Sequence, residues 1–278
     1  MRVTSKVTLN WSEFIQDAAI SKELVPMLSE FYDQLAPFYH LIYEDWESSI
    51  AWQGDFLHDI IQAEWGSDVK SVLDAACGIG TQCLALARRG YRMTASDLSQ
   101  GAVARAKVEA EVRGLDIAYS VCDMRALQSH HGGGFDLVIC AGNAIPHLLR
   151  DEDILLALKE MHACLRSGGG CILTTRRYDQ EERGVGIFKP FGVREEGGKR
   201  YLIFQIWDFE GEQYDFSMYF VEEDRGSGAV ETHVMRSRYY AISPDHLLEL
   251  MGEAGFVNVK RLDDRTTHPA TLVGTKAS

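Results

Sequence analysis

The order of apolar segments after Val69 constrains the fold more than any other feature of this sequence. Short apolar runs alternate there with stretches whose apolar residues recur at helical spacing. This alternation is typical of βαβ units, in which long right-handed crossovers connect the parallel strands of one sheet. The expected strands are SVLDAA, YRMTASD, IAYSVCD, FDLVICAG and CILTTRRY, and the expected helices cover residues 82–89, 100–113 and 151–165.

Different patterns flank this alternating region. Residues 23–43 and 48–65 carry apolar residues three and four apart, which predicts a helical cap before the sheet. Residues 188–240 are rich in aromatic and β-branched residues, with glycine-rich turns at residues 196–198 and 226–228, so we expect antiparallel strands there. A helix capped by Ser243 and two short strands then close the sequence.

These patterns together predict the fold class. We expect an α/β protein with a Rossmann-like, doubly wound, seven-stranded and mostly parallel sheet, an N-terminal helical cap and an antiparallel β lid insertion. The expected division assigns residues 1–68 to the cap, 69–180 to the core, 181–240 to the lid and 241–278 to the closing helix and strands.

The charge balance restricts the partners. The 41 acidic and 28 basic residues give a net charge of −13, which repels nucleic-acid phosphates and anionic lipids. No apolar run approaches the ~18 to 20 residues of a membrane span, and the N-terminus lacks a secretory pattern. We therefore expect a cytoplasmic protein with a small-molecule partner; a homo-oligomer is compatible with the sequence.

The cysteines and histidines follow no ligand spacing. The six cysteines form no C-x-x-C pair, and the nine histidines are scattered apart from His130 and His131. Cysteines in apolar segments of a chain kept in a reducing compartment remain thiols. The sequence therefore predicts reduced core cysteines and no metal site.

A glycine turn ends the first expected strand. Gly78 and Gly80 let the backbone turn tightly and approach a ligand, although glycines also simply terminate strands. The next strand ends at Asp97, 19 residues after Gly78, where a carboxylate can accept hydrogen bonds from ribose hydroxyls. Cys83 stands where an NAD fingerprint has its third glycine, and no G-K-[ST] follows, which argues against NAD and excludes a P-loop.

These motifs resemble those of class I S-adenosylmethionine-dependent methyltransferases. DAACGIG is similar to their first motif, ASDLS to their second, and VCDM to the motif whose acid meets the adenine amino group. FDLVIC and the later LRSGG complete the series in the family's order over residues 70–178. The resemblance implies S-adenosylmethionine as the cofactor.

The resemblance also implies cofactor contacts. Gly78 and Gly80 would lie under the methionyl part with the backbone of Ala76, Asp97 would hold the ribose, and Asp123 would accept from adenine N6. Asp74 would order the loop. The remaining expected contacts are Leu98, Met124 and Ala141, of which the first two are equally compatible with core packing.

Two further segments resemble glycine N-methyltransferases. These are ICAGNAIPHL after the fourth strand and RRYD after the fifth, where that subgroup holds the acceptor carboxylate with an Asn and an Arg, here Asn143 and Arg176. Apart from the resemblance, an Arg at a strand end is costly to bury unless it meets an anion. That anion is either a substrate carboxylate or Asp179 or a lid glutamate. Arg177 points to the opposite face of the strand and is expected to be structural.

Methyl transfer to an amine requires a neutral nitrogen facing the methyl carbon, and hydroxyl or imidazole groups can accept its protons. The candidates are Tyr178, Tyr239, Tyr240 and His147, each of which could equally serve packing.

Aromatic residues of the cap form a further candidate set. Tyr32, Tyr39 and Trp46 resemble cap residues that close over the cofactor, where rings could shield a sulfonium; burial against the core is the alternative.

The sequence also departs from the glycine-enzyme pattern. Thr174 and Thr175 replace an Asp-His pair, and the cap and most of the lid differ. The leading hypothesis is therefore N-methylation of glycine, sarcosine or a related amino acid. The alternatives are an N- or O-methyltransferase for a larger secondary metabolite and a non-catalytic cofactor-binding subunit.

Overall fold

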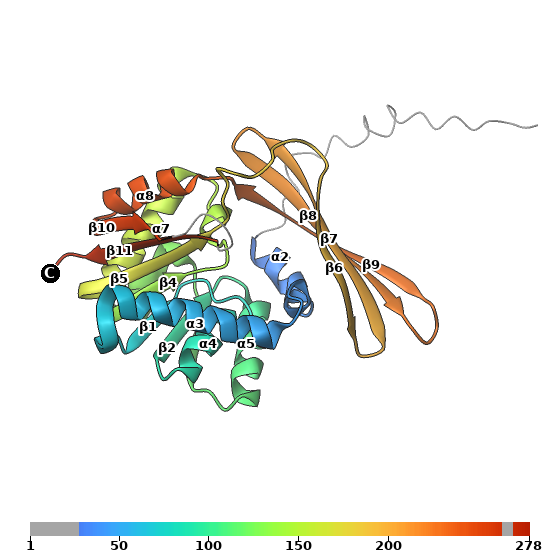
Figure 1. Ribbon diagram of the computed structural model, residues 1–278, viewed down its shortest axis with the longest axis horizontal. Coiled ribbons are helices and arrows are strands. Elements are labelled where there is room, and N and C mark those ends of the chain that lie inside the picture. Colours follow the sequence, from blue (N-terminus) through green and yellow to red (C-terminus); the bar gives the residue numbers. More distant parts are fainter. Residues whose placement is uncertain (1–27, 263–268) are drawn as a thin grey trace, which may run out of the picture.

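Two sheets, with one short helix between them, organise the chain (Figure 1). The computed structural model describes residues 28–262 and 269–278, so the first 27 residues of the expected cap lie outside the described part. A seven-stranded sheet forms the core, and a separate four-stranded sheet forms the lid.

The larger sheet has the order β10-β11-β5-β4-β1-β2-β3. The strands β1 to β5 pair in parallel, whereas β11 runs antiparallel to both β5 and β10. This confirms the expected mostly parallel, seven-stranded sheet. Its strands are β1 (Ser71–Asp74), β2 (Arg92–Asp97), β3 (Ile117–Val121), β4 (Phe135–Cys140), β5 (Leu165–Thr175), β10 (Phe256–Arg261) and β11 (Ala270–Lys276).

Helices cover both faces of this sheet and bury a separate apolar cluster on each (Figure 1). On one face lie α3 (Trp46–Trp65), α4 (Thr81–Arg88) and α5 (Gln100–Val112); on the other lie α6 (Leu127–His131), α7 (Asp151–Cys164) and α8 (Pro244–Glu253). The layers are those of a doubly wound α/β fold. Within residues 28–262 and 269–278, no helix combines the length and apolarity of a membrane span.

The lid is an antiparallel sheet in the order β6-β7-β8-β9. Its strands are β6 (Ile187–Glu196), β7 (Lys199–Glu210), β8 (Gln213–Asp224) and β9 (Val230–Tyr240). Gly197 and Gly198 join β6 to β7 with φ of 57° and 80°, so both adopt the left-handed conformation that a tight hairpin turn requires. The predicted lid strands and both glycine-rich turns are confirmed.

The cap differs from the expected long helix. The described helix α2 (Leu28–Leu35) stops before Pro37, which disfavours helical conformation at the preceding residue. A 3₁₀ turn, η1 (Tyr39–Ile42), follows, and Asp45 caps α3 by accepting from Ser48 N at 2.9 Å. Three more 3₁₀ turns are η2 (Gly66–Asp68), η3 (Met124–Ala126) and η4 (Ile145–His147).

Helix α2 fills the space between the two sheets (Figure 1). Phe31 and Leu35 pack with Trp207 and Phe216 of the lid in one buried aromatic cluster. The cap is thus attached to the lid by apolar burial, and it faces the edge of the core sheet where the strands β1 to β4 end.

A pair of glycine substitutions tests the packing of β5. A Cβ at Gly170 would lie 2.2 Å from Trp65 Cε2, and the Trp65 indole is fixed by its hydrogen bond to Thr275 Oγ1 at 3.1 Å. We expect Gly170→Ala to lower the free energy of unfolding by about 1 to 3 kcal/mol in urea denaturation. Gly252→Ala in α8, where a Cβ meets nothing within 4 Å, should instead raise the free energy of unfolding by up to about 1 kcal/mol. Equal stability of the two variants would contradict the packing.

Candidate functional site

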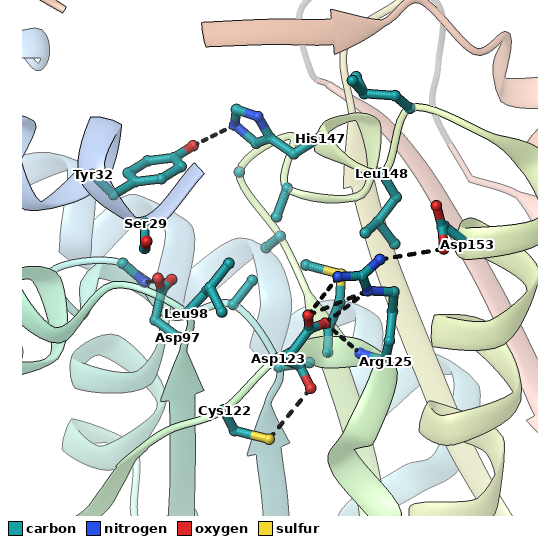
Figure 2. A pocket seen from close by; sticks show the side chains of 18 of the residues that line it. Ser29, Tyr32, Asp97, Leu98, Cys122, Asp123, Arg125, His147, Leu148 and Asp153 are labelled. Carbon is teal, nitrogen blue, oxygen red and sulfur yellow. Dashed lines mark hydrogen bonds and ion pairs between the residues drawn. The ribbon is translucent and has the colours of Figure 1, made fainter. Parts of the chain in front are cut away.

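A cavity of about 740 Å³ lies at the carboxyl ends of β1 to β4 (Figure 2). Parallel strands bring their ends to this edge, where open α/β sheets bind ligands. Ten of the side chains and glycines expected at the site line the cavity. They are Tyr32, Tyr39, Ala76, Gly78, Asp97, Leu98, Asp123, Met124, Ala141 and His147.

Hydrogen bonds join Asp97 to the glycine turn and to the start of the next helix. Gly78 N donates to Asp97 Oδ2 at 2.8 Å, and Ser99 N donates to Oδ1 at 2.9 Å. Gly78 has a φ of 53°, and a Cβ there would lie 3.3 Å from Tyr39 Cε1. A side chain at this position would therefore enter the narrow space between the turn and the cap.

A second buried carboxyl lies beneath the turn. Asp74 Oδ1 accepts from Ala76 N at 3.3 Å, while Oδ2 is buried and has no hydrogen-bond partner in the described structure. Burial raises the pKa of Asp74 to about 7, and the carboxylate of Asp97 adds to the rise. Near neutral pH this group is thus partly a neutral acid, able to donate one hydrogen bond.

Asp123 is paired with Arg125, a residue that no sequence motif singled out (Figure 2). The guanidinium contacts Asp123 Oδ2 at 2.7 Å and Asp153 Oδ1 at 3.2 Å. Although burial raises the pKa of Asp123, its bonds to Arg125 outweigh this and lower it, so the group stays a carboxylate. Asp123 therefore reaches the cavity as one member of an ion-pair network.

His147 joins the cap to the lid over the cavity. Its Nε2 lies 2.8 Å from the Tyr32 hydroxyl (Figure 2). Its ring centroid lies 4.0 Å from that of Tyr239. Burial lowers the pKa of His147 to about 3, and the charge of Arg176 also lowers it, whereas a hydrogen bond to the backbone of Arg238 opposes the change. His147 is therefore a neutral imidazole at physiological pH.

Asn143 ties the loop after β4 to the end of β5. Its Oδ1 accepts from Arg176 N at 2.9 Å and from Thr175 Oγ1 at 3.1 Å. Its Nδ2 donates to the Tyr178 hydroxyl at 2.9 Å, which in turn contacts the Tyr214 hydroxyl at 3.0 Å. Asn143 adopts a left-handed backbone with φ of 68°, a conformation that Asn tolerates better than most side chains.

The Arg176 guanidinium lies over the Trp207 ring, 4.8 Å from its centroid. Among residues 28–262 and 269–278, no carboxylate forms an ion pair with it. Asp179 pairs with Arg261 at 3.3 Å, and the nearby Glu181 pairs with Lys189 at 2.7 Å. Neither carboxylate therefore forms a direct ion pair with Arg176 in this part of the chain, although Glu181 lies near enough for its charge to act on the guanidinium.

The structure corrects three expected contacts. The Trp46 indole donates to Thr81 Oγ1 at 2.9 Å and lies against Arg105 and Arg113, away from the cavity. Gly80 caps α4 with φ of 102° and does not line the cavity.

The third correction concerns β9. Tyr239 stacks on His147, whereas Tyr240 points to the other face of the strand and packs on the cluster beneath α7 and α8. Asn143, Arg176 and Tyr178 are not among the residues that line the cavity. Trp207 and Tyr214 complete this group and were missed, because their strands carried no signal beyond aromatic content.

Comparisons with known proteins agree with this geometry. Residues 72–169 match the methyltransferase domain family. The chain carries a class I methyltransferase domain. The expected family and fold are thereby confirmed, and the domain's matched segment spans β1 to the early part of β5.

Named relatives share this methyltransferase domain over part of their length. A glycine/sarcosine N-methyltransferase of Parasynechococcus marenigrum (strain WH8102) is 36% identical over 136 residues, or 49% of this chain and 47% of the relative. A ubiquinone biosynthesis O-methyltransferase of Psychrobacter arcticus is 35% identical over 115 residues, or 41% and 43% of the two chains. The chain thus spans about half the length of the curated relatives it matches.

One solved structure extends the likeness to most of the chain. The SAM-bound CalS10 of Micromonospora echinaspora, an amino pentose methyltransferase, superimposes with a TM-score of 0.71 at 18% identity. The match covers 82% of this chain and 92% of the other. At this identity it supports the shared fold of the methyltransferase domain and its attachments.

Asp74 gives the methyltransferase domain a pH-dependent stability. Its pKa is about 7 in the folded chain and 3.8 for an ordinary aspartate, so the folded state holds an extra proton between these values. Stability therefore falls as pH rises through this window. In ligand-free urea unfolding, the free energy of unfolding of Asp74→Asn minus that of wild type should be about 2 to 3 kcal/mol larger at pH 8 than at pH 5.

The control is Asp116→Asn, which removes an exposed carboxyl and should show no such change. A constant difference between Asp74→Asn and wild type at both pH values would contradict the raised pKa.

Proposed function

We propose that this protein is an S-adenosylmethionine-dependent N-methyltransferase for a small amine that carries a carboxylate, such as glycine or sarcosine. The observation that supports the acceptor is the Arg176 guanidinium, which lies over Trp207 with no carboxylate partner in the described chain. The partial-length likeness to glycine/sarcosine N-methyltransferases points the same way.

The cavity fits the proposed cofactor. The Gly78 turn leaves room that a Cβ would fill, and the Asp97 carboxylate lines the same wall. Asp74 would order the loop beneath it by accepting from Ala76 N at 3.3 Å. When bound, S-adenosylmethionine supplies a methyl group activated on a sulfonium. Asp97 would hold the ribose, with Leu98 and Met124 beside the adenine.

Arg176 would orient the acceptor. A guanidinium presents parallel N–H donors that match a carboxylate bidentately, and burial strengthens the attraction. Trp207 lies against one face of the guanidinium and restricts its rotation. Asn143 fixes the backbone of Arg176 through its 2.9 Å hydrogen bond. The acceptor would therefore bind through its carboxylate, with its amine directed toward the cavity.

The surrounding hydroxyls would keep the amine reactive. Burial raises the pKa of Tyr32, Tyr39 and Tyr239, so all three remain neutral and their oxygens can accept amine protons. His147, neutral and bonded to Tyr32 at 2.8 Å, holds that hydroxyl in place. No strong base is required, because orientation alone can supply about 7 to 11 kcal/mol of the barrier reduction.

The test removes the charge of Arg176. Purified protein is given S-adenosylmethionine with glycine, sarcosine, other small amino acids, aromatic amines and phenols, and the products are identified by mass spectrometry. We expect methylated small amino acids, and Arg176→Gln should lower kcat/KM for them by about 10² to 10³-fold through loss of the carboxylate contact. Binding of S-adenosylhomocysteine, followed by calorimetry, should stay within about twofold.

Arg183→Gln is the matched control, because Arg183 pairs with Glu212 on the lid surface at 2.7 Å and should keep full activity. Product from aromatic or larger acceptors alone, unaffected by Arg176→Gln, would contradict the amino-acid proposal and favour a larger metabolite. Tight S-adenosylhomocysteine binding without any product would instead favour a cofactor-binding subunit.

A further inference from the structure

A cluster of soft and borderline donor atoms lies beside the cavity. The Cys122 sulfur and one ring nitrogen each from His130 and His131 all lie within 4.8 Å of one another. Cys122 follows β3, and the two histidines end α6, so the chain between them turns back on itself. The sequence spacing hid this cluster, because its members belong to a strand end and a helix end rather than to one ligand motif.

The donor set is the kind that binds zinc. Thiolate and imidazole groups suit Zn²⁺, and three protein ligands leave a fourth position for water. Donors around tetrahedral zinc lie about 3.5 Å apart, so the cluster has to contract by roughly 1 Å. The His130 side chain is exposed and can supply much of this movement.

Neighbouring groups support the arrangement. His131 Nε2 lies 3.2 Å from the buried Ser96 hydroxyl, a contact of the sort that orients a ligand ring. The two histidine rings are edge to face, with centroids 4.6 Å apart. Glu160, which accepts from Gln128 N at 2.8 Å, adds negative charge beside α6 that favours a cation.

We propose that Cys122, His130 and His131 form a binding site for a divalent cation of borderline softness, such as Zn²⁺, at the edge of the cavity. The Cys122 thiol lines that cavity and donates to Asp123 O at 3.3 Å (Figure 2). Metal binding requires the thiolate and so removes this hydrogen bond from the turn that carries Asp123 and Met124. The cation and the nucleoside cofactor should therefore each weaken the binding of the other. This coupling rests on the proposed function.

Cobalt reports on the site without any cofactor. Chelator-treated full-length protein titrated with Co²⁺ should bind one ion per chain and develop a near-ultraviolet thiolate-to-cobalt band. Cys122→Ser should abolish that band, and His130→Gln should weaken cobalt binding about tenfold or more. Because His130 is exposed, its variant keeps the test valid if Cys122→Ser fails to fold.

Cys171→Ala and His58→Gln are the matched controls, since both residues lie outside the cluster, and they should titrate as wild type. Absence of the thiolate band in wild type, or equal cobalt binding by His130→Gln, would overturn the site.

Calorimetry then tests the opposition between the two ligands. Saturating Zn²⁺ should weaken S-adenosylhomocysteine binding about tenfold in wild type and have no effect in His130→Gln. Equal affinity with and without Zn²⁺ in a protein that passes the cobalt test would overturn the coupling. Failure of the metal-free protein to bind S-adenosylhomocysteine would contradict the proposed function instead, leaving the cobalt result intact.

Discussion

The side chain of Asn143 joins the two strand ends from which the acceptor side of the site is built. It accepts from the Arg176 backbone and the Thr175 hydroxyl, and it donates to Tyr178. The left-handed backbone at Asn143 costs some stability, and these three hydrogen bonds offset that cost by holding the residue in place. Arg176 is thereby held beside the carboxyl edge of the sheet, where we propose that it meets the acceptor carboxylate.

The lid and the cap determine how strongly that charge acts. Helix α2 and the inner face of the lid bury Phe31, Trp207 and Phe216 in one aromatic cluster, which displaces water from the space between the sheets. Electrostatic attraction strengthens as water is excluded. The neutral His147 and the neutral tyrosines around it add no competing charge. This environment is the reason that we propose a carboxylate-bearing acceptor.

Patterns in the sequence were sufficient to predict the sheet and part of the site. The alternation after Val69 predicted the parallel strands, which the sheet order confirms. Gly78 and Asp97 were expected at the same ligand site, and both line the cavity. Both features are local or follow from strand order. The break in the cap helix at Pro37 was also visible in the sequence but was outweighed by apolar periodicity.

Contacts between elements that lie far apart in the sequence could not be predicted from such patterns. The pairing of Arg125 with Asp123 and Asp153 depends on how η3 meets α7, and the direction of Tyr240 depends on the register of β9. Trp46 looked like a cofactor contact because it follows the aromatic cap, but its indole bonds to Thr81 as α3 packs on α4. In all three examples, the direction of the side chain and the element it packs against determine its contacts, and neither follows from a local sequence pattern.

A crystal structure of the protein with S-adenosylhomocysteine and glycine would show directly which group holds the acceptor. We expect the glycine carboxylate within hydrogen-bond distance of the Arg176 guanidinium, with its amine facing the cofactor sulfur. Glycine bound elsewhere, with Arg176 still contacting only Trp207, would contradict it.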